Sequence, residues 1–219
     1  MKKDLTEIVL IVDKSGSMAP YVNDTIGGIN NFITEQKKVV GSANVTLIMF
    51  DTFYNKVFTK NLNEVTELTN GDYFASGSTA LIDAMCRAID ETGAKLSKMN
   101  EKDRPSKVIF VTLTDGEENA SHEYTNVVLK EKIKHQEERY SWQFMFLSAD
   151  PKTFDVAKNT WGISHTYAYH TKDTNIAYAA VNSTMSNFRS TGKVDDSLMD
   201  ATKTGSATSG NTHGSASNK

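Results

Sequence analysis

The chain has 219 residues, of which 38% are hydrophobic and 23% are charged, so it is long enough for one domain with a sizeable core. Its 24 lysines and arginines against 27 aspartates and glutamates give a formal net charge of -3, which argues against a nucleic-acid-binding protein. The single cysteine, Cys86, excludes an internal disulfide framework and a cysteine-rich zinc site. Because no apolar run approaches the roughly 20 residues that span a bilayer, we expect no membrane contact.

The first residues, Met1-Lys2-Lys3-Asp4, lead directly into an apolar segment. They lack the apolar stretch and the small-residue cleavage site of a signal peptide. With only one cysteine in the chain, this predicts a protein of the reducing cytoplasm.

Short β-branched or aromatic segments alternate with segments of helical periodicity along the chain. The expected strands are Glu7–Asp13, Asn44–Asp51, Thr52–Thr59, Lys107–Thr114, Trp142–Ala149 and Ser164–Tyr169. The expected helices include Ala80–Leu96, Phe154–Trp161 and a last helix over about Asn175–Arg189. This alternation predicts βαβ units, and hence an α/β fold with a doubly wound, mostly parallel six-stranded sheet and helices on both faces. Only a tight turn separates the second and third segments, which predicts a hairpin and one antiparallel strand at the sheet edge.

The pattern ends near Arg189. Residues 201–219 contain no apolar residue larger than alanine and are dominated by Gly, Ser, Thr and Asn. Such a segment buries too little surface to offset the entropy of ordering. We therefore expect one domain over residues 1–189 and a flexible tail over residues 190–219.

Oxygen-bearing side chains occur at the ends of three expected elements. Asp13, Ser15 and Ser17 follow the first strand, Thr79 opens the helix Ala80–Leu96, and Asp115 follows the fourth strand. In open α/β sheets ligands bind beyond the carboxyl ends of the strands, where the strand order reverses, so we expect these five residues to converge. Two carboxylates and three hydroxyls form a hard donor set that suits Mg²⁺, Mn²⁺ or Ca²⁺ better than zinc or copper.

Several of these side chains have simpler explanations. Ser15 and Ser17 could cap a helix, and either Ser78 or Thr79 could cap the helix that follows them. Asp83 is expected to complement the dipole of the same helix. Glu117 and Glu118 are typical of a solvated loop face, although they could repel an acidic ligand, a repulsion that Lys14 could offset.

Taken together, the residues after the first strand, before the helix and after the fourth strand resemble the metal-ion-dependent adhesion site of von Willebrand factor type A domains. Asp13, Ser15, Ser17, Thr79 and Asp115 match its five positions. Phe146–Asp150 and Trp161–Ile163 are similar to the later part of stand-alone bacterial and phage members, and the resemblance covers the chain from about Leu5 to Arg189. It implies a doubly wound sheet, one divalent cation, and a protein partner whose Asp or Glu completes the coordination.

Three functions are compatible with these residues. A metal-dependent protein-binding module without catalytic activity is favoured, because no histidine lies in 13–17, 77–79 or 115–118 to serve as a base. An adaptor subunit of an ATP-driven machine differs from it only in the partner. A Mg²⁺-dependent phosphoryl-transfer enzyme would use Asp13 as nucleophile. Such phosphatases pair the nucleophile with a second Asp two residues on, where this chain has Ser15, and a P-loop motif is missing as well.

Overall fold

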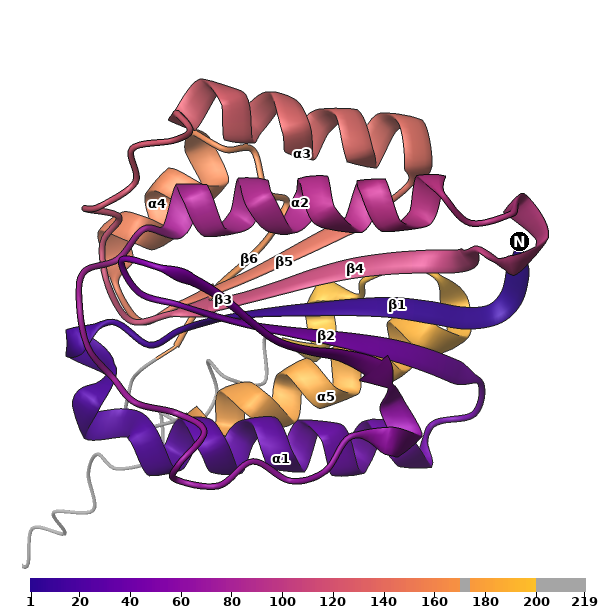
Figure 1. Ribbon diagram of the computed structural model, residues 1–219, viewed down its shortest axis with the longest axis horizontal. Coiled ribbons are helices and arrows are strands. Elements are labelled where there is room, and N and C mark those ends of the chain that lie inside the picture. Colours follow the sequence, from indigo (N-terminus) through magenta and orange to yellow (C-terminus); the bar gives the residue numbers. More distant parts are fainter. Residues whose placement is uncertain (170–173, 200–219) are drawn as a thin grey trace, which may run out of the picture.

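The computed structural model describes residues 1–169 and 174–199. At its centre is a six-stranded sheet in the order β3-β2-β1-β4-β5-β6, covered by helices on both faces (Figure 1). The strands are β1 (Lys2–Asp13), β2 (Ser42–Phe50), β3 (Tyr54–Asn61), β4 (Pro105–Thr114), β5 (Gln143–Ser148) and β6 (His165–Ala168). The helices are α1 (Val22–Lys38), α2 (Leu81–Ser97), α3 (Asn126–Tyr140), α4 (Pro151–Asn159) and α5 (Thr174–Thr191).

The sheet topology confirms the predicted fold class. β1 pairs in parallel with β2 on one side and with β4 on the other. β5 and β6 continue the parallel arrangement, and β3 alone pairs antiparallel, at the edge. The hairpin between β2 and β3 therefore accounts for the single reversed strand, as the tight turn in the sequence predicts.

Alternate side chains of β1 enter two separate cores. Ile8 and Leu10 pack on the face covered by α1 and α5, whereas Val9 and Ile11 pack on the face covered by α2, α3 and α4 (Figure 1). This explains the continuous apolar run of the strand, because both of its faces are buried. Cys86 is a fully buried member of the second core. No helix in the described part of the chain is both long enough and apolar enough to span a bilayer.

Helix α4 begins with a capping aspartate and a proline. Asp150 Oδ2 accepts a hydrogen bond from the backbone N–H of Thr153 at 2.7 Å, and Pro151 occupies the first turn. Proline costs nothing there, because its missing N–H would have no partner within the helix.

The sequence predicts a flexible tail from residue 190 onward, whereas residues 190–199 pack against the domain. Helix α5 continues to Thr191, a short 3-10 helix covers Asp196–Leu198, and Met199 is 1% exposed within the first core. Val194 packs against the same core. A few apolar side chains thus hold residues 190–199 against the domain, while residues 200–219 of the predicted tail lie outside the described residues.

Candidate metal centre

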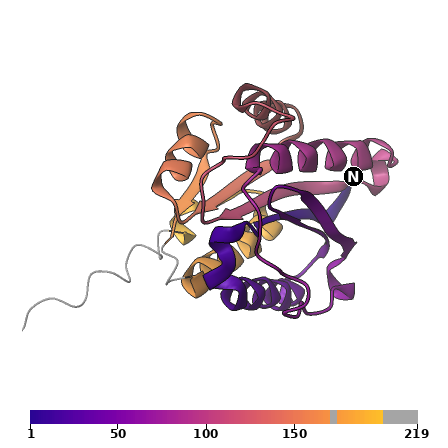
Figure 2. The same cartoon turned by 60° about the vertical axis from the view of Figure 1, so that its left-hand side comes forward.

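All five candidate ligands lie at the carboxyl end of the sheet, the end that Figure 2 turns toward the viewer. Asp13 is the last residue of β1. Ser15 directly precedes a short 3-10 helix, Gly16–Tyr21, and Ser17 lies in its first turn. Asp115 directly follows β4, the parallel neighbour of β1, and Thr79 lies two residues before α2. Because the chain leaves β1 toward β2 while β4 flanks its other side, this is the point of strand-order reversal where α/β sheets bind ligands.

Asp13 is a buried carboxylate with both oxygens hydrogen-bonded. Asp13 is 0% exposed. Oδ1 accepts the backbone N–H of Ser15 at 2.7 Å, and Oδ2 accepts the hydroxyl of Thr114 at 2.6 Å. Burial outweighs these hydrogen bonds and raises the pKa of Asp13 to about 6, with a smaller contribution from the charge of Asp115. Burial also raises the pKa of Asp115. For both carboxylates, burial is the largest influence on the pKa.

The hydroxyl groups join the two carboxylates into one cluster. Ser15 Oγ lies 3.1 Å from Ser17 Oγ, which donates a hydrogen bond to Asp115 Oδ1 at 2.7 Å. A Cβ atom built on Gly116 would lie 3.3 Å from Ser17 Oγ and 3.7 Å from Thr79 Oγ1, so the Thr79 hydroxyl faces the same space. The structure thus brings the five residues together from three separate segments.

Backbone contacts hold the loop that carries these ligands. The buried Tyr73 hydroxyl donates to the backbone oxygen of Asp13, and the N–H of Gly16 donates to the carbonyl of Gly77 at 3.0 Å. Gly77 has φ +72, and a Cβ there would approach Thr52 Oγ1 to 2.9 Å, so this position favours glycine. No pattern in the sequence indicates this role of Tyr73, because its contact with Asp13 forms only in the folded chain.

Thr114 is a supporting residue that the sequence analysis missed. Its hydroxyl holds Asp13, and it is the residue immediately before Asp115. The feature of the sequence that could have indicated this role is the position of Thr114 at the end of a buried strand, beside a candidate ligand.

Lys14 and Glu118 have other partners than the sequence predicts, whereas Glu117 lies on the surface as expected. Lys14 forms an ion pair with the buried Asp51 rather than offsetting the acidic loop. Lys152 Nζ lies 2.8 Å from Glu117 Oε1, so Glu117 is paired on the surface. Glu118 is not a solvated loop residue, because its carboxylate accepts the N–H groups of Ile82, Ala120 and Ser121.

Helix α2 is capped by a distant loop and not by the hydroxyls that precede it. Glu118 Oε2 accepts the N–H of Ile82 at 2.9 Å, and Asn119 Oδ1 accepts the N–H of Thr79 at 2.9 Å. The caps expected from Ser78 or Thr79 are therefore wrong, and Ser78 instead donates its N–H to a threonine of the β2–β3 turn. Loop 116–125 fixes the backbone of Thr79 beside the cluster.

Asp83 does more than complement the helix dipole. Its carboxylate accepts the backbone N–H groups of three consecutive residues, His122, Glu123 and Tyr124. These contacts tie loop 116–125 to the first turn of α2. The sequence placed Asp83 correctly in that turn but indicated nothing about its partners.

The donor set fits a hard divalent cation. The cluster consists of two carboxylates and three neutral hydroxyls. In the described residues no group of three or more His, Cys, Asp or Glu side chains could hold a metal ion. Oxygen donors of this kind are those that Mg²⁺, Mn²⁺ and Ca²⁺ prefer. One divalent ion would also balance the charge of Asp13 and Asp115.

If the cluster holds Mg²⁺, replacing Gly116 with valine should weaken its binding about tenfold or more, because the added methyl groups would occupy the space beside the Ser17 and Thr79 hydroxyls. Isothermal titration with MgCl2 measures this loss. Gly71→Val is the matched control, since Gly71 is an exposed loop residue whose nearest contact would be 3.6 Å away. Equal Mg²⁺ affinities for the two variants would contradict a cation site beside Ser17 and Thr79.

No family model and no curated protein matches this chain. Solved structures do match it. The pilus adhesin SpaC from Lactobacillus rhamnosus GG, in an open conformation, is 16% identical, with 86% of this chain and 30% of that chain covered and a TM-score of 0.59. A mutant of the PilB minor pilin from Streptococcus sanguinis is 9% identical, with coverages of 88% and 64% and a TM-score of 0.59. A von Willebrand factor type A protein from Catenulispora acidiphila is 14% identical, with coverages of 83% and 42% and a TM-score of 0.57.

At these identities the likeness concerns the fold. This chain spans less than two thirds of each of these structures. It has a von Willebrand factor type A-like fold, in which a mostly parallel six-stranded sheet with one antiparallel edge strand is flanked by helices.

Proposed function

We propose that this chain is a divalent-cation-dependent protein-binding module without catalytic activity. Asp13, Ser15, Ser17, Thr79 and Asp115 would hold Mg²⁺, and a partner protein would supply an Asp or Glu side chain to the ion. The von Willebrand factor type A-like fold commonly mediates protein interactions. The proposal is carried by the 2.7 Å contact between Ser17 and Asp115, which joins residues 98 positions apart at the ends of adjacent strands.

The protein residues have distinct roles in this proposal. The Ser15 N–H and the Thr114 hydroxyl orient the carboxylate of Asp13, and Ser17 orients that of Asp115. Because the remaining donors are neutral hydroxyls, the protein contributes only two negative charges. Mg²⁺ held there would supply an electrophilic centre. Since Mg²⁺ prefers six oxygen ligands and five side chains are offered, a position would be left for a partner's carboxylate.

The residue two positions after Asp13 argues against phosphoryl transfer. Phosphatases with an aspartate nucleophile pair it with a second Asp at that position, where this chain has Ser15. A binding role does not require Asp13 to contact the partner, since the partner would reach the ion.

Addition of Mg²⁺ should raise the thermal midpoint of unfolding, because an ion that binds only the native state stabilises it by mass action. At about 100 times the Kd the gain is about 2.7 kcal/mol, which corresponds to about 5–10 °C for a chain of this size. Differential scanning calorimetry with MgCl2 or EDTA measures the shift. Asp115→Asn should lose it. Glu117→Gln is the matched control and should keep it, because Glu117 is an exposed neighbour paired with Lys152.

Partner binding should follow the same pattern. Affinity capture followed by mass spectrometry should recover a partner with the wild-type protein in Mg²⁺ and lose it in EDTA or with Asp115→Asn. Capture that survives both treatments would overturn the proposed function, as would the lack of any Mg²⁺-dependent shift in thermal midpoint.

A further inference from the structure

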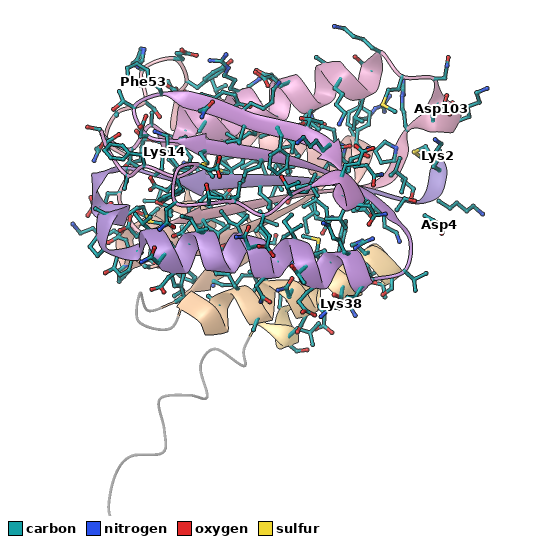
Figure 3. All side chains as sticks on the ribbon, turned by 60° about the horizontal axis from the view of Figure 1, so that its bottom comes forward. Lys2, Asp4, Lys14, Lys38, Phe53 and Asp103 are labelled. Atoms are coloured by element: carbon teal, nitrogen blue, oxygen red, sulfur yellow. The ribbon has the colours of Figure 1, made fainter. Side chains whose placement is uncertain are left out.

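Two phenylalanine side chains are exposed at the end of the molecule that carries the candidate metal centre. Phe53, in the turn between β2 and β3, is 76% exposed, and Phe74, in the loop before α2, is 78% exposed. Figure 3 shows Phe53 at the same end of the sheet as Lys14, the residue that follows Asp13. Isolated apolar residues are common on protein surfaces, but two aromatic rings on adjoining loops beside a ligand site form a candidate contact surface.

The loops that carry the two rings meet at one carboxylate. Asp51 Oδ1 accepts the backbone N–H of Phe53 at 2.7 Å, and the hydroxyl of Ser76 lies 3.4 Å from Asp51 Oδ2. Ser76 is two residues beyond Phe74, and its N–H donates to the carbonyl of Lys14 at 2.8 Å. Both loops are therefore bonded directly to the segment that contains three of the five candidate ligands.

Further contacts fix the positions of both loops. Tyr73, the neighbour of Phe74, is 2% exposed and donates its hydroxyl to the backbone oxygen of Asp13. On the other loop, the Thr52 hydroxyl accepts the N–H of Ser78 at 2.9 Å. The two rings are thus exposed on an ordered backbone, so a partner that covers them does not have to order the loops.

Charge at this end of the sheet favours a partner with a single acidic residue. Lys14 is paired with Asp51, and Lys152 is paired with Glu117. Glu118 is satisfied by backbone N–H groups. A strongly acidic partner would therefore be repelled by the acidic side chains at this end. The two lysines would attract it little, because their charges are already balanced.

We propose that the partner presents one Asp or Glu flanked by large apolar side chains, which pack on Phe53 and Phe74 while the acid reaches the metal centre. This inference rests on the proposed function and adds the chemistry of the partner segment. Aromatic residues that become buried at an interface commonly contribute much of its affinity. Phe53 and Phe74 would therefore determine specificity without binding the ion.

Two blocked pentapeptides test the proposal, one with Asp between leucines and one with Asp between glycines. NMR titration in MgCl2 should show that the leucine-flanked peptide binds about tenfold more tightly, as expected from burial of apolar surface. In the double variant Phe53→Ser/Phe74→Ser the two peptides should bind equally, at the level of the glycine-flanked peptide. Val40→Ser is the control, because Val40 is 94% exposed but follows α1 at the opposite end of the sheet.

The outcomes separate this inference from the proposed function. If both peptides bind the wild-type protein equally in Mg²⁺ and dissociate in EDTA, the apolar contact is overturned and the function survives. If the double variant loses the Mg²⁺-induced rise in thermal midpoint, the two rings act on the metal centre itself and the inference fails. If neither peptide binds although Mg²⁺ raises the midpoint, the inference fails, and the Mg²⁺-dependent capture of a partner decides the proposed function.

Discussion

Replacing Asp13 with asparagine should make the metal-free protein more stable at neutral pH and abolish its response to Mg²⁺. Burial raises the pKa of Asp13 from 3.8 to about 6, so ionising it in the folded state costs on the order of 3 kcal/mol. Asparagine removes this cost and retains both contacts. Its oxygen accepts the Ser15 N–H, and its amide donates to Thr114, whose hydroxyl turns to the Gly116 carbonyl at 3.3 Å.

The gain should depend on pH in a defined direction. The folded state holds the Asp13 proton more tightly than the unfolded state does. The stability of the wild-type protein therefore falls as the pH rises from about 4 to about 6, and the full penalty remains above that range. Asp13→Asn lacks this term, so its advantage should be largest at neutral pH and should shrink toward pH 4.

Calorimetry in EDTA measures this effect. We expect a net gain of about 1–2 kcal/mol, or about 2–8 °C in Tm, because the hydrogen bonds of a neutral amide are weaker than those of a carboxylate. With excess Mg²⁺ the order should reverse as only the wild-type protein binds the ion. If the variant is less stable than the wild type in EDTA at neutral pH, the carboxylate of Asp13 stabilises the metal-free fold, and the expectation is wrong.

Replacing Gly28 with alanine should destabilise the protein severely. Gly28 lies on α1 where that helix packs against α5, and a Cβ there would approach ring atoms of Tyr178 to 2.1 Å. Tyr178 is only 4% exposed, so its ring has little room to move and the helices would have to separate. Overpacking of this kind costs about 1–3 kcal/mol or more.

The adjacent glycine provides the control. Gly27 is exposed on the same helix, and a Cβ there would meet no atom within 4 Å. Gly27→Ala should stabilise the protein by about 0.5–1 kcal/mol, because alanine favours the helix. Urea unfolding followed by circular dichroism compares the two variants. Similar midpoints for both would mean that α1 and α5 do not approach each other as the structure shows.

The sequence by itself was sufficient for the order and type of the main elements. Strand runs such as Lys107–Thr114 and the hairpin turn after Asn44–Asp51 are local signals, and they matched β4 and the β2–β3 pair closely. Four of the candidate ligands were predicted in the same way, because Asp13, Ser15, Ser17 and Asp115 lie where β1 and β4 end. Thr79 was predicted from its position just before the helix that became α2. Element bounds differed where a strand continued into less apolar residues, as at Lys2–Thr6 of β1.

Tertiary structure decided the partners of the charged residues. Lys14 pairs with Asp51, 37 residues away, and Glu118 caps a helix 36 residues earlier in the chain. Neither pairing leaves a periodic or composition signal, since it depends on which loops meet at the sheet edge. The same holds for residues 190–199, where a single buried methionine, Met199, finds a site on the core that only the folded domain creates. Local patterns therefore determine which elements form and where their polar ends lie, whereas long-range contacts determine which of those polar groups are neutralised.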